Sequence, residues 1–98
     1  MTGDDLAARE AALQLIHEGA RLHYERDDDD ALLHGDQLYA QGLARLAQAG
    51  DLEAIAQLAD TISLVAQANA EGRPERTKDV WDTSHYALLA RRRDRPPR

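Results

Sequence analysis

The chain has 98 residues, enough for one domain, and its formal charge of −6 is unevenly distributed. Residues 91–98 hold five Arg and one Asp, so they carry +4 and the rest carries −10, which argues against nucleic-acid binding by the folded part. The absence of cysteine excludes disulfides and cysteine catalysis and suits a cytoplasmic protein, and no apolar run approaches the ~20 residues of a membrane span.

Alanine and leucine dominate the apolar residues, with 18 Ala and 14 Leu, and both favour helices. The β-branched and aromatic residues that favour strands are few. Small alanine side chains let helices approach closely, but each buries little area. We therefore predict an all-α fold, a four-helix antiparallel bundle-like unit over residues 1–92, and we expect dimerisation to complete its burial.

The first predicted helix covers residues 6–26, where Leu6, Leu13 and Ile16 lie on one face. Gly19 interrupts this helix, at a cost of ~1 kcal/mol relative to Ala. A glycine at such a position can let another helix approach closely.

Four consecutive acids, Asp27 to Asp30, follow this helix. Like charges repel and Asp is a poor helix former, so the run suits a solvated turn in which Asp30 could cap the next helix. The alternative is a site for a divalent cation, because carboxylate oxygens suit Mg²⁺ or Ca²⁺.

Two further helices are predicted over residues 31–49 and 52–70, joined by a tight corner. Gly50 suits the left-handed position that ends helices, and Asp51 is well placed to cap the next one. With so short a link, the two helices should pack antiparallel as an αα-hairpin. Their apolar faces, at intervals of three, four and seven, are formed by Leu32, Tyr39, Leu43 and Leu46, and by Ile55, Leu58, Ile62 and Val65.

The charged, irregular stretch 73–80 is predicted to be a loop. Trp81 precedes Asp82, a residue suited to the N-cap position, so we expect Trp81 to pack across the start of a short helix over 83–92. Residues 93–98, rich in Arg and Pro, are expected to be disordered.

The four histidines are scattered along the chain. His17 and His23 are six positions apart and do not face each other well on a helix, so we interpret them as structural residues rather than metal ligands. The sequence contains no glycine-rich phosphate loop, no zinc-ligand spacing and no nucleophile–base pair.

Three features of the sequence are spaced as in one enzyme family: Gly35-Asp36, Gly50-Asp51 and Tyr86. Residues 35–92 resemble the trans-polyprenyl diphosphate synthases without a gap: the first pair opens a helix there, the second matches a corner, and the tyrosine lies on a later helix. Arg92 falls where the family carries a lysine, which implies a weak anion-binding role. The family's Gly-Glu pair near the end of the second helix is replaced by Ala68-Asn69.

The first helix extends the resemblance. Residues 24–28 fall where the family carries its first aspartate-rich motif, whose first, second and fifth places hold Mg²⁺ against a diphosphate. Those places carry Tyr24, Glu25 and Asp28 here, so the resemblance implies Glu25 and Asp28 as remnants of a Mg²⁺ site. The second aspartate-rich motif and an Arg pair are absent, which implies that the chain is not an enzyme.

In full-length relatives, the two helices that match residues 31–72 form much of the dimer interface. Some relatives pair a small non-catalytic subunit with a large catalytic one. The resemblance thus implies an accessory or regulatory subunit in isoprenoid diphosphate metabolism, acting as a homodimer or as a heteromer with a full-length prenyl diphosphate synthase. The residues expected to serve core and interface together are Tyr39, Leu43, Leu46, Ile55, Leu58 and Ile62.

Two other functions remain open. The corner at Gly50-Asp51, with Ala54 and Ala59, resembles a tetratricopeptide unit and would suit a helical adaptor, although no second copy at the ~34-residue period is present. The other is a small acidic protein that binds a metal or a diphosphate through Glu25 and residues 27–30.

Overall fold

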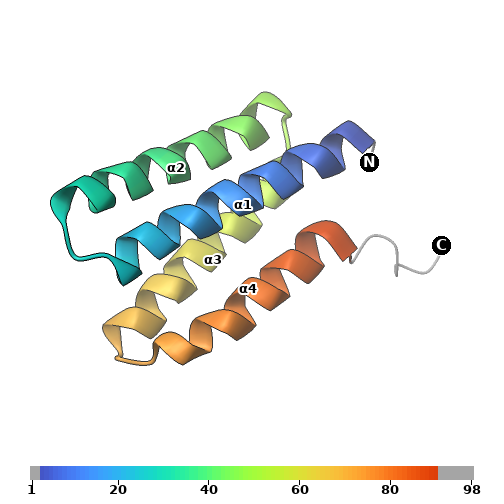
Figure 1. The fold of residues 1–98 in the computed structure, drawn as a ribbon. Helices are drawn as coiled ribbons and strands as arrows, with labels where there is room; N and C mark the ends of the chain where they lie inside the picture. The colour runs from blue at the N-terminus through green and yellow to red at the C-terminus, as the bar shows by residue number, and fades with distance from the viewer. Residues whose placement is uncertain (1–2, 91–98) are drawn as a thin grey trace.

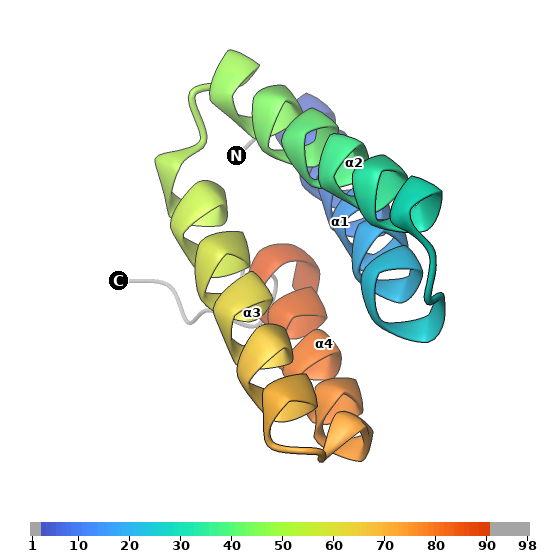
Figure 2. The same ribbon diagram turned by 90° about the vertical axis from the view of Figure 1, so that its left-hand side faces the viewer.

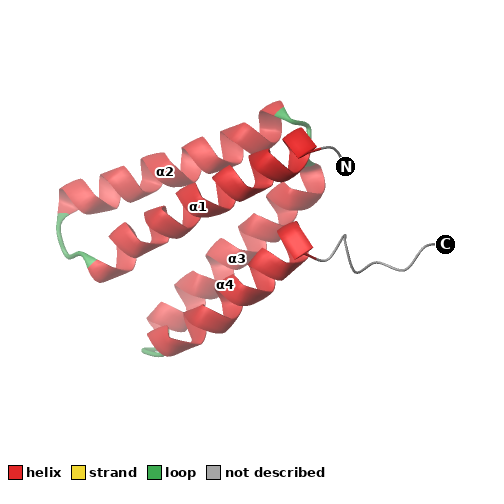
Figure 3. Ribbon diagram, turned by 45° about the vertical axis from the view of Figure 1, so that its right-hand side comes forward, coloured by secondary structure: helices red, strands yellow, loops and turns green. Residues whose placement is uncertain are grey.

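The computed structural model describes residues 3–90, and this part of the chain is an all-α bundle without strands. Short loops join its helices (Figure 3). In chain order, its elements are α1 (Gly3–Glu25), α2 (Asp29–Gln48), α3 (Leu52–Ala70), the 3₁₀ helix η1 (Pro74–Arg76), α4 (Thr77–His85) and the π-helical turn η2 (Tyr86–Ala90), as Figure 1 shows.

Local signals place both ends of α3 as predicted. The Asp51 side chain accepts a hydrogen bond from the Ala54 N–H at 3.2 Å, so it caps the helix. Gly50 and Gly72, which follow α2 and α3, have φ values of +69° and +72°, a conformation that side chains disfavour. The prediction of a left-handed Gly50 is confirmed.

The start of α2 differs from the prediction. Asp28, rather than Asp30, is the N-cap, and its side chain accepts a hydrogen bond from the Ala31 N–H at 2.7 Å. Asp30 instead lies in the first turn with Asp29, where acids interact favourably with the helix dipole. The acids at 27–30 are all exposed, as expected for a solvated turn.

A fourth helix is present as predicted, and residues 83–90 are helical, but its predicted start at 83 is wrong because the helix begins at Thr77. The predicted loop over 73–80 is therefore also wrong, since residues 74–80 are helical. Pro74 opens η1, where its missing N–H costs no helical hydrogen bond. Trp81 therefore lies in the middle of α4 and does not pack across a helix start. It is buried with Ser84 and Leu88, at intervals of three and four that mark one helical face.

The helices pair as two hairpins, α1 with α2 and α3 with α4 (Figure 1). The prediction that α2 and α3 pack along each other as a hairpin is wrong. These two helices meet at the 49–51 corner and diverge from it (Figure 2), so they contact each other much less than α1 contacts α2. α1 fills the angle between α2 and α3 and packs against both.

Glycines explain why α1 and α2 form the close pair. A Cβ atom on Gly19 would lie 2.8 Å from the Gly35 carbonyl oxygen, and one on Gly42 would lie 3.0 Å from the carbonyl oxygen of Ala12. The α2 glycines lie seven positions apart, on one face. The two backbones are thus in direct contact, as expected for Gly19.

The core lies between the two hairpins. Buried side chains from α1, α3, α4 and η2 meet there, joined by one residue of α2. Within the second hairpin, the Thr61 hydroxyl of α3 forms a buried hydrogen bond with the Ser84 hydroxyl of α4 at 2.9 Å. The largest fully buried apolar side chains are Ile16, Leu46, Leu58, Val65 and Leu88.

Candidate interaction surface and polar sites

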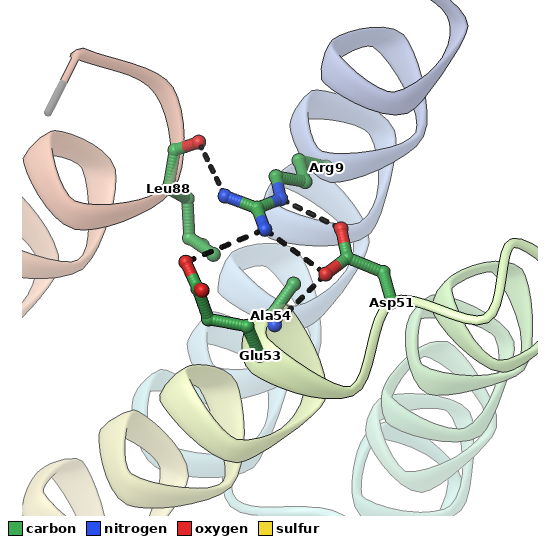
Figure 4. Close-up of polar contacts among 5 residues, drawn as sticks. All are labelled: Arg9, Asp51, Glu53, Ala54 and Leu88. Carbon is green, nitrogen blue, oxygen red and sulfur yellow. Dashed lines mark hydrogen bonds and ion pairs between the residues drawn. The ribbon is translucent and has the colours of Figure 1, made fainter. Parts of the chain in front are cut away.

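A buried arginine joins the two hairpins at one end of the molecule (Figure 4). The Arg9 side chain, 2% exposed, donates hydrogen bonds to both carboxylate oxygens of Asp51, at 2.7 and 2.9 Å. Its third nitrogen donates to the Leu88 carbonyl at 3.2 Å, and Glu53 lies 3.6 Å away. We call these four residues the Arg9 cluster. Because Asp51 also caps α3, one carboxylate both starts a helix and neutralises a buried cation.

No local pattern in the sequence indicates the Arg9 cluster. Asp51 was predicted as a cap, but its partner Arg9 lies 42 positions away. The hydrogen bond with Asp51 raises the pKa of Arg9, which keeps the guanidinium charged. Arg9 itself is enclosed by α1, the start of α3 and η2, so we interpret the cluster as a structural link. An open hollow of about 340 Å³ lies on its outer side, lined by Arg9, Asp51 and Glu53 among others.

A groove of about 540 Å³ lies between α1 and α4, with α3 also contributing to its lining. Ala20, Tyr24, Val65 and Trp81 give it apolar and aromatic walls. The His17 ring stacks on Trp81 with the ring centroids 4.2 Å apart, so the groove has one ordered aromatic wall. His17 therefore has a packing contact within the chain.

The proposed remnants of a metal site, Glu25 and Asp28, have separate roles. Glu25 ends α1 and lines the groove, whereas Asp28 caps α2 and lies 3.0 Å from the Arg26 guanidinium. The hydrogen bond from Ala31, helped by Arg26, lowers the pKa of Asp28. Within residues 3–90, no group of three or more His, Asp or Glu side chains is arranged to hold a metal ion.

A second histidine lies where α1 and α2 cross. His23 Nε2 is 2.6 Å from an Asp36 carboxylate oxygen, and its ring stacks on Tyr39 at 5.5 Å. Gly35 makes room for this ring, because a Cβ at that position would lie 2.9 Å from His23. Gly35-Asp36, the pair that carried the family resemblance, lies inside α2 and contributes to the α1–α2 contact.

The six predicted core and interface residues fall into two classes. Leu46 and Leu58 are 0% exposed, so they are core residues of the single chain. The other four pack against that core and keep part of their surface exposed: Tyr39, Leu43, Ile55 and Ile62.

The two α3 residues of this class, the half-buried Ile55 and Ile62, belong to a longer apolar stripe. It follows intervals of three and four along one flank of α3, beside the buried face that contains Leu58. We call it the α3 seam, and it consists of Leu52, Ile55, Ala59, Ile62 and Ala66. Leu52 is 76% exposed and Ala59 is exposed, while the others are half-buried.

The remaining predicted anion-binding residue, Arg92, lies outside the described residues, as does the predicted tail at 93–98. No helix between residues 3 and 90 combines the length and the apolar character that a membrane crossing requires. Comparison of the chain with models of known protein families, with curated proteins and with solved structures found no match.

Proposed function

We propose that the protein is a non-catalytic helical subunit that acts by pairing with a second helical chain along the α3 seam. The α3 seam is the observation that carries this proposal. Single exposed apolar side chains are normal on a protein surface, but the seam places two exposed and three half-buried apolar residues at heptad-like spacing on one flank. This spacing suits contact with another helix. Helices in bundles usually pack through side chains spaced three and four positions apart on each helix.

The position of the seam supports the same role. It lies on the flank of α3 opposite to Leu64, while Thr61 of the buried face bonds to α4. Because α2 and α3 diverge from their corner, α2 does not cover α3 along its whole length. A partner helix could therefore contact the exposed part of the seam without disturbing the core.

The resemblance of residues 35–92 to polyprenyl diphosphate synthases suggests which partners to test. These are a second copy of this chain and a full-length synthase of the same cell, within cytoplasmic isoprenoid diphosphate metabolism. A non-catalytic role is supported by Asp28, whose carboxylate caps α2 and pairs with Arg26. We include no metal or other cofactor in the proposal.

The test is to place a charge on the seam. Ala59→Glu changes an exposed residue, so the monomer should fold normally, but the carboxylate would be desolvated in a seam contact. Leu64→Glu is the matched control, since Leu64 is 50% exposed on the opposite flank of α3. Light scattering should show that the wild type and L64E each form a dimer or a complex with the synthase. The A59E variant should associate at least about tenfold more weakly.

Pairing along the α3 seam predicts different association of these two variants. Equal association of A59E and L64E would contradict it, as would a wild type that is monomeric at high concentration and does not bind the synthase. Circular dichroism of both variants checks that the monomer has kept its helices.

A further inference from the structure

The groove between α1 and α4 is lined by one face of each of three helices. Its lining residues lie three or four positions apart on each helix: Arg21 and Tyr24 on α1, Val65 and Asn69 on α3, and Lys78 and Trp81 on α4. The volume of about 540 Å³ lies within the roughly 300–1,000 Å³ of small-molecule sites. No residue of the α3 seam lines this groove, so the two surfaces are separate.

The inner wall of the groove is apolar and aromatic. Ala20 and Val65 are buried there, and the Trp81 ring is held by its stack on His17. Tyr24 is 39% exposed, and burial of the rest of this side chain raises its pKa. The wall can therefore contact an apolar or aromatic body, and the Tyr24 ring can also attract a cation to its face.

The two cations that line the groove are each paired with a carboxylate outside it. Arg21 donates two hydrogen bonds to Glu18, at 3.0 and 2.6 Å, and Lys78 donates one to Asp82 at 2.7 Å. Glu18 and Asp82 do not line the groove. The positive charges of Arg21 and Lys78 are therefore balanced in large part on their own helices, which makes the groove a poor site for an anion.

Two exposed carboxylates also line the groove, Glu25 at the end of α1 and Glu75 in η1. Within residues 3–90, neither carboxylate forms an ion pair with another side chain. The hydrogen bond to Glu18 is the largest cause of the raised pKa of Arg21, and the charge of Glu25 contributes least to it. Together with the charge of −10 on residues 1–90, Glu25 and Glu75 favour a positively charged ligand.

We propose that the groove binds an organic cation, an amine or quaternary ammonium group that carries an apolar or aromatic body. The body lies against the inner wall and Tyr24, and the charged group lies toward Glu25 and Glu75. Aromatic rings are the side chains with which proteins recognise quaternary ammonium groups. Binding in the groove does not depend on pairing along the α3 seam.

The first test compares three probes that share a benzyl group and differ in charge: benzyltrimethylammonium, benzyl alcohol and phenylacetate. Trp81 is the only tryptophan, so its indole N–H gives a single nuclear magnetic resonance signal that reports on the groove. Benzyltrimethylammonium should shift this signal with a dissociation constant at least about tenfold below those of the other two probes. Equal binding of the three probes, tighter binding of phenylacetate, or an indole signal that the cation does not shift would overturn the proposal.

The second test removes the two carboxylates while keeping the shape of the groove. Glu25→Gln/Glu75→Gln should weaken the binding of benzyltrimethylammonium about tenfold and leave that of benzyl alcohol unchanged. Glu10→Gln/Asp60→Asn is the matched control, because it removes two exposed carboxylates that do not line the groove. Equal binding of the cation by the two double variants would contradict the site. Circular dichroism checks that both variants have kept their helices.

The outcomes are independent of the proposed function. Ala59 does not line the groove, so A59E should bind benzyltrimethylammonium as the wild type does. A wild type that binds the cation but associates with no second chain supports the organic-cation site and removes pairing along the seam. A wild type that pairs along the seam but does not bind the cation removes only the organic-cation site.

Discussion

A Cβ atom on Gly35 would lie 2.8 Å from the Gly19 carbonyl oxygen, and one on Gly19 would lie the same distance from the Gly35 carbonyl oxygen. The contact is reciprocal, so α1 and α2 cross at a point where neither helix has room for a side chain. This crossing holds the first hairpin together and positions His23 against Asp36 beside it.

Replacement of Gly35 by Ala should therefore destabilise the protein. The new methyl group meets a backbone oxygen, which cannot rotate away, and such overpacking costs about 1–3 kcal/mol even where helix propensity improves. Urea unfolding followed by circular dichroism measures the loss. Gly3→Ala is the control, because nothing lies within 4 Å of that position, and equal stability of the two variants would contradict the contact.

Asp51→Asn should destabilise the fold strongly. Asparagine keeps the cap of α3 but leaves the buried Arg9 cation without its bidentate partner, which costs about 3–5 kcal/mol. Glu53→Gln, at a side chain that is 66% exposed, should cost under about 1 kcal/mol. Thermal unfolding compares the two variants.

The double variant R9M/D51N isolates the buried charge. It removes the cation together with its partner, so it should recover part of the stability that D51N loses. A double variant no more stable than D51N would show that the ion pair is not the cause.

The Asp28 cap of α2 should make the stability of the protein fall at acid pH. The pKa of Asp28 is lowered by its hydrogen bond from Ala31, so its contribution is complete above the usual Asp pKa of about 4 and is lost as the pH falls through the lowered folded value. Melting temperatures of the wild type should fall below about pH 4 more steeply than those of D28N, whose amide caps without titrating. Parallel curves for the two proteins would argue against this cap.

The Tyr39 hydroxyl should lose its proton only at unusually high pH. Burial, with smaller effects of Tyr24 and Asp36, raises the pKa of Tyr39 to about 12. The folded state thus holds this proton more tightly, so its stabilising contribution is present below the usual tyrosine pKa of about 10 and declines as the pH rises toward 12. Ultraviolet titration should show a late phenolate step that Y39F removes; a Tyr39 step at the usual value would contradict the burial.

Part of the fold follows from local sequence signals. Both ends of α3 match the prediction. Asp51 caps the start through a residue three positions away, and Gly72 follows the end with a positive φ. The start of α4 was missed because its inner face carries the half-buried Thr77 and the buried Ser84, so the apolar pattern is weak. Ser84 is suited to burial only because Thr61 of α3 donates a hydrogen bond to it.

The candidate site could be predicted only in part. Tyr39, Leu43, Ile55 and Ile62 were selected by their helical spacing, but Leu46 and Leu58 have the same spacing and lie wholly inside the chain. Periodicity identifies the apolar side of a helix without showing which part of that side a neighbouring helix covers.

The sequence by itself determined the helical class, the bend at Gly50 and the cap at Asp51, because each depends on propensities and on residues a few positions apart. Only the tertiary structure decided which helices pair. Gly19 meets Gly35, and Arg9 meets Asp51, through contacts between distant segments, where the shapes and charges of whole surfaces select the partner. For that reason the close hairpin joins α1 to α2, and the flank of α3 is left as the exposed seam.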